Sequence, residues 1–287
     1  ITAGGKRVRP GFTIASSAVG QSNAVPVSDE VLMGGVAVEL VHLGSLYHDD
    51  VMDEAEMRRN VPSVNAVWGN HTAILAGDFL LARASEIAAS LGTEIAGLLA
   101  RTIGELCEGQ ILELQSTYKP SRTEESYEQS IAGKTASLLS TACRIGGLTA
   151  GLKRRTVDQL TTFGHTYGMA FQIVDDILDV IATEDQLGKP AGNDLIEGVY
   201  TLPVLLALES DVGEQLHELL GKELSTDERD RALSLIRSTG AVEEAFTRAQ
   251  FWAQKAKLEL ESLPSSPATN ALSAATNHLL DRAQSAS

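Results

Sequence analysis

Long stretches of the chain carry apolar residues at three- and four-residue spacing, and short polar breaks separate these stretches. That spacing gathers apolar side chains on one face of an α-helix. Alternating runs of β-branched and aromatic residues, which would predict strands, are nearly absent. The stretches predicted to be helical are 29–53, 72–91, 94–117, 126–146, 156–182 and 202–208. The pattern predicts an all-α protein.

Several of these helices are apolar around most of their circumference, for example 74–84 and 138–150. Such a helix belongs inside a bundle rather than on its surface. The segments in 210–287 are more charged and more clearly amphipathic, which predicts outer helices. No linker or low-complexity tract divides the chain, so we expect 1–287 to form a single-domain bundle of long helices. The abrupt start at Gly4-Gly5-Lys6 is consistent with a missing N-terminal segment.

The charge balance and the cysteine content restrict the class of protein. Lys+Arg 23 against Asp+Glu 38 gives a net charge of −15, which argues against nucleic acid as a partner. Cys107 and Cys143 cannot form a disulfide framework, so a reducing compartment is expected. No apolar run approaches the ~20 residues of a transmembrane segment, and no signal-peptide pattern opens the chain. These features favour a cytoplasmic protein.

Two near-identical acidic motifs lie 126 positions apart: Asp49-Asp50-Val51-Met52-Asp53 and Asp175-Asp176-Ile177-Leu178-Asp179. On a helix, the three aspartates of each motif fall within an arc of about 100°. Carboxylates this close raise one another's pKa unless a cation compensates them. Mg²⁺ suits such oxygen ligands and also binds substrate phosphates. A solvated acidic helix end would explain one motif, but two copies that each follow an apolar run favour a metal site.

Basic residues accompany the acidic motifs along the chain. They are Lys6, Arg7 and Arg9 near the start, Arg58 and Arg59 after the first motif, Lys134 between the motifs and Lys189 after the second. Isolated, each would be interpreted as part of a surface ion pair of little energetic worth. Together with two metal motifs, they favour diphosphate binding, in which arginine forks and lysine charges hold phosphate oxygens directly.

With these motifs the chain resembles the trans-type polyprenyl diphosphate synthases of the polyprenyl synthetase family. The stretches that carry the resemblance are GGKRVRP (4–10), HDDVMDEAEMRRN (48–60), GKT (133–135), FQIVDDILD (171–179) and GKPAGNDL (188–195). The resemblance implies helices around a central cavity, the two acidic motifs facing each other across its mouth, and a homodimer. It also implies that isopentenyl diphosphate is condensed with an allylic diphosphate, which several Mg²⁺ ions help to ionise.

The resemblance also implies a role for each matched residue. The direct metal ligands are Asp49, Asp53 and Asp175, with Asp50, Asp176 and Asp179 supporting them directly or through water. The allylic diphosphate is bound by Arg58, Lys134 and Lys189, and isopentenyl diphosphate by Lys6, Arg9, His42 and Arg59. Thr135 and Gln172 stabilise the developing cation, and Gln110 and Glu113 add hydrogen bonds. A lone histidine on an apolar helix is more often a core residue, but His42 lies about 20° from Asp49 around the helix.

Two positions depart from the family pattern. Asn60 stands where the family usually has glycine, and asparagine tolerates the left-handed backbone that such a turn requires. Val199 stands where many members carry a lysine, which removes one cation near the allylic diphosphate. We expect activity to persist, because five other basic residues remain at matched positions.

The helix that carries the first motif also lines the product tunnel in this family. Val41, Gly44 and Ser45 lie eight, five and four positions before Asp49. Short-chain members place Phe or Tyr four or five positions upstream, whereas both residues here are small. They either keep a tunnel open for a long-chain product, such as a quinone side chain released at a membrane surface, or only permit close helix packing.

Other interpretations of the sequence stay open. One is a shorter-chain farnesyl or geranylgeranyl diphosphate synthase. Another is a non-catalytic subunit of a heteromeric synthase, although such subunits tend to lose an acidic motif. A terpene cyclase would usually alter the second motif and lack the Gly-Gly-Lys segment. A metal-binding scaffold without turnover would leave the basic residues unexplained.

Overall fold

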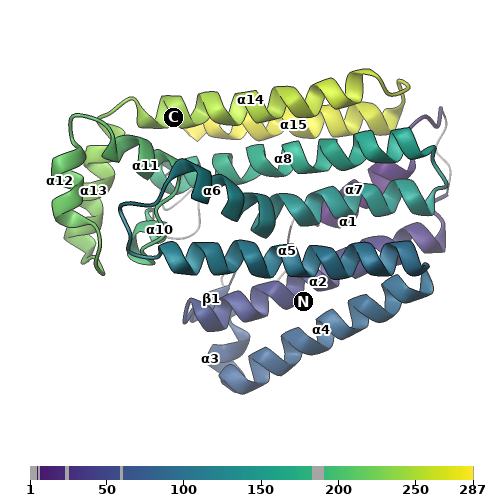
Figure 1. Cartoon of the computed structure of the whole chain (residues 1–287), viewed down its shortest axis with the longest axis horizontal. Helices are drawn as coiled ribbons and strands as arrows, with labels where there is room; N and C mark the ends of the chain where they lie inside the picture. Colours follow the sequence, from purple (N-terminus) through teal and green to yellow (C-terminus); the bar gives the residue numbers. More distant parts are fainter. Residues whose placement is uncertain (1–4, 6, 23–25, 59–60, 183–190, 287) are drawn as a thin grey trace. The chain divides into compact units, whose positions relative to one another are not determined.

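The computed structural model describes residues 5, 7–22, 26–58, 61–182 and 191–286. Helices dominate these ranges (Figure 1). The only strands within them are β1 (Met57–Arg58) and β2 (Val61–Pro62), which pair antiparallel as Met57 with Pro62 and Arg58 with Val61. The all-α prediction is therefore confirmed.

The helices follow the sequence pattern closely. The first half of the chain forms α1 (Val8–Ser17), α2 (Asp29–Met52), α3 (Val64–Trp68), α4 (Asn70–Ser90), α5 (Thr93–Ser116), α6 (Glu124–Ile131) and the π-helix η1 (Ala132–Ala136). The second half forms α7 (Ser137–Thr149), α8 (Arg154–Ile181), α10 (Asn193–Ile196), α11 (Leu202–Leu208), α12 (Gly213–Leu219), α13 (Thr226–Arg237), α14 (Ala241–Glu261) and α15 (Pro267–Ala286).

Hydroxyl residues at the polar breaks start several helices. The side chain of Ser28 accepts a hydrogen bond from the Val31 amide at the start of α2. The negative charge of Asp29 in the first turn interacts favourably with the helix dipole. Thr123 caps α6 through the amide of Ser126 in the same way. At α13, Ser225 and Glu228 form a reciprocal capping box. Local sequence therefore fixes where these helices begin.

The chain divides into two compact units. Unit 1 consists of 1–104, 138–164 and 259–273, and unit 2 of 105–137, 165–258 and 274–287. Helices α5, α8, α14 and α15 each contribute residues to both units. The single domain and the central cavity stay predictions, and each unit is described by itself below.

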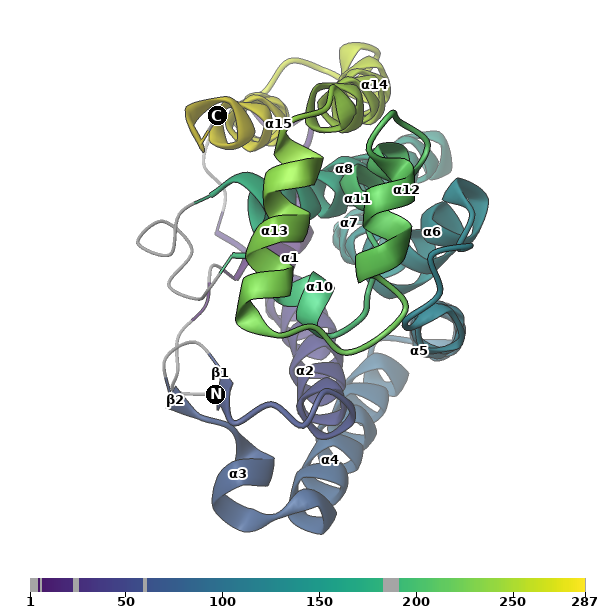
Figure 2. The same ribbon diagram turned by 90° about the vertical axis from the view of Figure 1, so that its left-hand side faces the viewer.

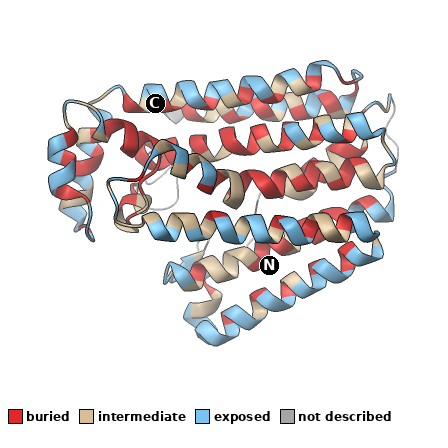
Figure 3. Ribbon diagram, viewed as in Figure 1, coloured by how far each residue is buried: buried red, intermediate tan, exposed pale blue. Residues whose placement is uncertain are grey.

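Unit 1 is built around α2, which packs against α1 and α4 (Figures 1 and 2). The α2 residues Ala37, Val38 and Val41 are completely buried. Every residue of α7 is buried or half-buried, whereas α4 has one face open to solvent (Figure 3). The expectation that the apolar helices lie inside a bundle is correct for α7 and only partly correct for α4.

In unit 2, α11 contacts α6, α12 and α13 (Figure 2). Its residues from Leu202 to Ala207 are buried. Arg237 at the end of α13 donates from Nε to the carbonyl oxygen of Val180 at 2.7 Å, which ties α13 to the end of α8. The segment after the second acidic motif is therefore held by the helices that follow it.

One expectation about α2 needs correction. By length and composition this helix passes the test for a membrane-crossing segment, with a mean hydropathy of 1.2, although no such run was expected from the sequence. Its packing against α1 and α4 is that of a core helix, and core helices of soluble proteins pass the same test.

Candidate active site

The first acidic motif occupies the C-terminal end of α2. The Asp53 amide donates to the carbonyl oxygen of Asp49 at 2.8 Å and closes the last helical turn. Asp50 is buried, Asp49 is half-buried and Asp53 is exposed. Arg58 donates to Asp50 Oδ1 from Nε at 2.6 Å, and its Nη2 lies 2.5 Å from the same oxygen. The structure thus joins Arg58, predicted to bind diphosphate, to the buried aspartate of the motif.

Asn65 holds the loop that follows this motif, and the sequence interpretation missed it. Its Nδ2 donates to the carbonyl oxygens of Asp50 at 3.1 Å and Ala55 at 3.0 Å. Ser63 donates from Oγ to the Ala55 carbonyl at 2.5 Å and also caps α3. The residues that Ser63 and Asn65 contact lie in and before a turn, in which Glu54 has a φ of 49°. Helical or strand periodicity in the sequence does not predict such hydrogen bonds.

Two glycines bring α2 and α4 close together next to the first motif. The His48 ring covers Gly77, and its Nε2 lies 3.2 Å from the Ile74 carbonyl oxygen. A Cβ at Gly77 would lie 2.3 Å from that nitrogen. Gly44 faces α4, where its Cβ would lie 3.1 Å from the Gly77 carbonyl oxygen. His48, the residue before Asp49, is therefore packed tightly against α4.

The three positions expected to influence product length have different surroundings. Val41 is completely buried, and Gly44 is buried against α4. Ser45 is half-buried and donates from Oγ to the His42 carbonyl at 2.9 Å. Close helix packing therefore accounts for Gly44, and Ser45 is the position whose small size the α2–α4 contact does not explain.

The second acidic motif lies near the C-terminal end of α8. Asp176 is 3% exposed, and both of its carboxylate oxygens accept hydrogen bonds. Tyr127 donates to Oδ2 at 2.5 Å, and Gln172 donates from Nε2 to Oδ1 at 2.8 Å. Thr135 in turn donates from Oγ1 to the Gln172 side-chain oxygen at 2.7 Å. Three residues predicted from the sequence, Thr135, Gln172 and Asp176, thus belong to one hydrogen-bonded chain.

Burial sets the electrostatics of this chain. It raises the pKa of the Asp176 carboxyl, because a low-dielectric environment disfavours the charged form. The hydrogen bonds from Tyr127 and Gln172 act in the opposite direction. Burial also raises the pKa of the Tyr127 phenol well above its usual value. Tyr127 is therefore neutral, and its hydroxyl donates a hydrogen bond to Asp176.

The other two aspartates of the second motif have different partners. The backbone amide of Asp194 donates to Asp179 Oδ2 at 3.1 Å, and the Gly192 amide donates to the Asp179 carbonyl at 2.8 Å. Asp175 is half-buried, and its Oδ1 lies 3.6 Å from Nη2 of Arg282 in α15. Residues 191–194 are thus attached to the motif through Asp179.

Lys134 lies in η1, where the sequence predicted one uninterrupted helix from 126 to 146. Its Nζ lies 2.6 Å from Oε1 of Glu113 in α5. A Cβ at Gly109 would lie 2.5 Å from the Lys134 amide nitrogen, and one at Gly133 would lie 2.6 Å from the Glu105 carbonyl oxygen. This approach of α5 is a tertiary contact, so helix periodicity could not reveal the π-helical interruption.

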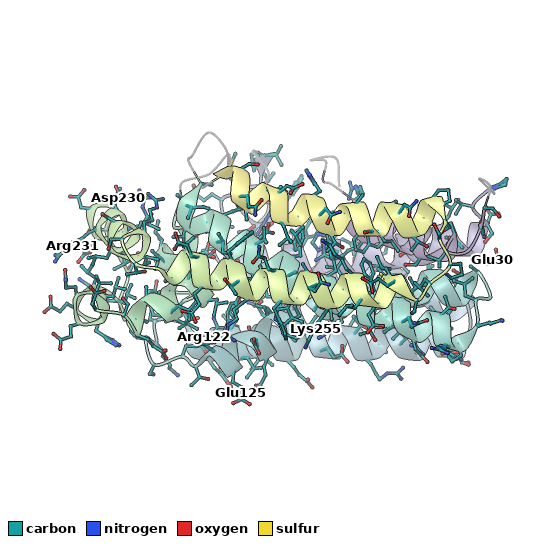
Figure 4. The ribbon with its side chains drawn as sticks, turned by 90° about the horizontal axis from the view of Figure 1, so that it is seen from above. Glu30, Arg122, Glu125, Asp230, Arg231 and Lys255 are labelled. Atoms are coloured by element: carbon teal, nitrogen blue, oxygen red, sulfur yellow. The ribbon has the colours of Figure 1, made fainter. Side chains whose placement is uncertain are left out.

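Arg122 and Tyr127 are the other site residues that the sequence interpretation missed. Both are almost completely buried, at 8% and 1% exposure. The Arg122 guanidinium lies 5.5 Å from the centroid of the Tyr127 ring, and its Nη1 donates to the Tyr200 carbonyl at 3.1 Å. Glu125, three residues further on, is exposed and points outward (Figure 4). In the sequence, only the presence of a tyrosine within a run of glutamates distinguishes the Tyr127 position.

The residues expected to bind isopentenyl diphosphate are described only in part. Arg9 in α1 and His42 in α2 are half-buried in unit 1. Lys6, Arg59 and Lys189 lie outside the described residues, as does Asn60. Arg7, a member of the N-terminal basic cluster to which the resemblance assigned no individual role, forms an ion pair with Glu39 of α2. That ion pair joins the start of α1 to the helix that carries His42.

The donor chemistry of the two motifs fits Mg²⁺. Among the described residues, no group of three or more histidine, cysteine, aspartate or glutamate side chains converges as a metal cage. Mg²⁺ in diphosphate enzymes usually needs only one or two carboxylates, with water and phosphate oxygens completing the shell. Asp49 and Asp53 in unit 1, and Asp175 and Asp179 in unit 2, offer such oxygen ligands.

Comparison with known proteins connects these features to a family. The sequence profile described as polyprenyl synthetase matches residues 1–236. A nonaprenyl diphosphate synthase from Mycobacterium tuberculosis is 41% identical over 98% of this chain and 84% of its own length. A heptaprenyl diphosphate synthase component 2 from Geobacillus stearothermophilus is 40% identical over 95% of this chain and 84% of its own.

A solved structure agrees with these relatives. The geranylgeranyl pyrophosphate synthase from Corynebacterium glutamicum, complexed with calcium and isoprenyl diphosphate, superposes with a TM-score of 0.84 at 40% identity. The match covers 98% of this chain and 86% of that one. The proteins that this chain resembles thus include makers of both long and shorter prenyl diphosphates.

Proposed function

Because the chain belongs to the polyprenyl synthetase family and is a prenyltransferase, we propose that it builds a long-chain all-trans polyprenyl diphosphate from isopentenyl diphosphate and an allylic diphosphate. The observation that carries this proposal is the match to the family over residues 1–236, which includes both acidic motifs. The hydrogen-bonded chain of Thr135, Gln172 and Asp176 supports it, since it joins three residues with matched roles.

The reaction needs no nucleophilic side chain. The allylic C–O bond breaks, and diphosphate leaves with the electron pair. The double bond of isopentenyl diphosphate then attacks the allylic cation and forms the new C–C bond, which leaves a tertiary cation. This cation loses a proton to the departing diphosphate and forms the double bond of the product. When bound, Mg²⁺ supplies positive charge that stabilises this leaving group.

The protein contributes charge and orientation to this reaction. Asp49, Asp53, Asp175 and Asp179 would hold the metal ions, and Lys134 and Arg58 would contact the allylic diphosphate. Lys189 has the same proposed role. Arg9 and His42, with Lys6 and Arg59, would bind isopentenyl diphosphate. The Thr135 carbonyl oxygen and the Gln172 side-chain oxygen would face the developing cation, where fixed dipoles stabilise charge best.

The proposed product is longer than four isoprene units. Small residues at Gly44 and Ser45 leave no aromatic side chain upstream of the first motif. A shorter product remains the alternative, since a geranylgeranyl pyrophosphate synthase is 40% identical to this chain. The relative named as a component 2 favours a second alternative, in which a partner subunit is needed for turnover.

We further propose that the enzyme acts as a homodimer in the cytoplasm and supplies a quinone side chain. Large apolar side chains on α4, among them Leu75 and Phe79, are exposed in unit 1 and support a subunit interface there. A long polyprenyl product is insoluble in water, so release at a membrane surface follows from the proposed product.

The decisive test incubates the purified chain with Mg²⁺, isopentenyl diphosphate and farnesyl or geranylgeranyl diphosphate, and sizes the dephosphorylated products by mass spectrometry. We expect a ladder that ends well beyond four isoprene units. A product of three or four units would contradict the long-chain proposal and leave prenyl transfer intact. Absence of turnover with every primer would contradict an autonomous enzyme, and turnover restored by a partner subunit would identify a heteromeric synthase.

A further inference from the structure

We propose that Tyr127 and Arg122 are positioning residues that hold the Asp176 carboxylate, so that this aspartate anchors the second acidic motif instead of binding metal directly. The inference rests on the proposed function. It differs from the roles assigned above, because neither Tyr127 nor Arg122 belongs to a motif of the sequence.

Both carboxylate oxygens of Asp176 accept hydrogen bonds from neighbouring side chains. Tyr127 occupies Oδ2 at 2.5 Å and Gln172 occupies Oδ1 at 2.8 Å. The residue is only 3% exposed, and the two hydrogen bonds fix both oxygens inside the protein, which leaves little of the carboxyl group accessible to a metal ion. The aspartate is therefore arranged as an acceptor within the protein, and the less buried Asp175 next to it is left to face a ligand.

Tyr127 is buried in a position to hold the Asp176 carboxyl group. Its ring is 1% exposed, and its hydroxyl donates to the carboxylate across 49 positions of sequence. Because this hydrogen bond is short and both partners are buried, it fixes the orientation of the carboxyl group that accepts it. Because Asp176 lies one residue from Asp175 and three from Asp179 on α8, fixing its side chain fixes the rotation of that helical turn.

Arg122 supports Tyr127 through contact with the face of its ring. Its guanidinium lies over Tyr127 at 5.5 Å and is tethered through Nη1 to the Tyr200 carbonyl at 3.1 Å. Nε and Nη2 are buried and find no hydrogen-bond partner among the described residues. A buried arginine in this state is costly unless nearby negative charge compensates it, and Glu113 and Asp176 are the acidic side chains that interact with it.

The experiment compares Tyr127→Phe with the unaltered chain. The substitution keeps the ring and its contact with Arg122 and removes only the hydroxyl. We expect the Mg²⁺ concentration for half-maximal activity to rise about 10-fold, as for other residues that orient metal ligands. The KM for isopentenyl diphosphate should change less than two-fold, and the rise in Tm that Mg²⁺ with inorganic diphosphate produces should shrink by half or more.

Tyr118→Phe is the matched control. Tyr118 also lies in unit 2, and its hydroxyl donates a hydrogen bond to the Ile196 carbonyl at 3.1 Å instead of to Asp176. It should keep the Mg²⁺ dependence of the unaltered chain. An unchanged Mg²⁺ dependence in Tyr127→Phe, or an equal shift in Tyr118→Phe, would overturn the inference. If the unaltered chain makes no product, the proposed function fails instead, and the thermal shift still tests Tyr127.

Two substitutions test Arg122. Arg122→Leu removes the charge and should shift the Mg²⁺ dependence in the same direction as Tyr127→Phe. Arg122→Lys keeps a charge and should lie closer to the unaltered chain. Since both residues act through one carboxylate, the double variant Arg122→Leu with Tyr127→Phe should shift less than the product of the single shifts. Independent, multiplying shifts would contradict a shared role.

Discussion

Gly44 and Ser45 are neighbouring small residues on α2 with different surroundings. The Cβ that a larger residue would carry at Gly44 meets α4, 3.2 Å from Leu81 Cγ. Ser45 is half-buried and bonds only within its own helix, to the His42 carbonyl at 2.9 Å. A large residue at Gly44 would therefore disturb packing, whereas one at Ser45 tests the product tunnel.

Ser45→Phe should shorten the product, because the added ring would obstruct the growing chain next to the first motif. The measurement is the length distribution of the dephosphorylated products by mass spectrometry. Ser45→Ala removes the hydroxyl without adding volume and should leave that distribution unchanged. If Ser45→Phe gives the same products as the unaltered enzyme, with comparable turnover, Ser45 does not border the tunnel.

The sequence indicates candidate acidic and cationic side chains, but it gives no sign of the residues that hold them. Aspartates, Lys134 and Gln172 stand in short motifs with recognisable spacing. Tyr127 and Asn65 act through contacts that are distant in sequence or that depend on a turn, such as the bond from Tyr127 to Asp176. Such residues carry no local signature, because only the folded chain gives them their partners.

At the scale of elements, helix boundaries were predicted closely and one interruption was not. The stretch 156–182 corresponds to α8, Arg154–Ile181, since apolar spacing reports a local property. The stretch 126–146 instead contains α6, η1 and the start of α7. The approach of Gly109 to Gly133 accompanies this change, and that contact joins segments far apart in sequence.

Gly109→Ala should destabilise the protein by about 1–3 kcal/mol, since the added methyl group would overpack the contact between α5 and η1. The measurement is the free energy of unfolding in urea. Gly104→Ala in the same helix is the control, because its Cβ would meet no atom within 4 Å. That variant should be neutral or more stable by up to about 1 kcal/mol. Equal stability of both variants would show that the contact is not tight.

At the scale of the whole molecule, exposed apolar residues on α4 mark the surface where we propose that a second copy binds. Leu75 and Phe79 lie one turn apart on α4 and are 67% and 64% exposed, whereas the opposite face of the helix packs on α2. Exposed apolar side chains that cluster on one face mark contact surfaces, whereas single ones are common on any protein. Their spacing places both on the face that α2 does not cover.

Phe79→Glu should therefore convert the proposed dimer into monomers, because a carboxylate buried at an apolar interface loses its hydration without gaining a partner. Size-exclusion chromatography with light scattering would measure the change as a halving of the molar mass. Phe251→Glu provides the control: Phe251 is also exposed, on α14, but it lies beneath Lys255, whose Nζ is 4.4 Å from the ring centroid. A dimer that survives Phe79→Glu and dissociates with Phe251→Glu would move the interface from α4 to α14.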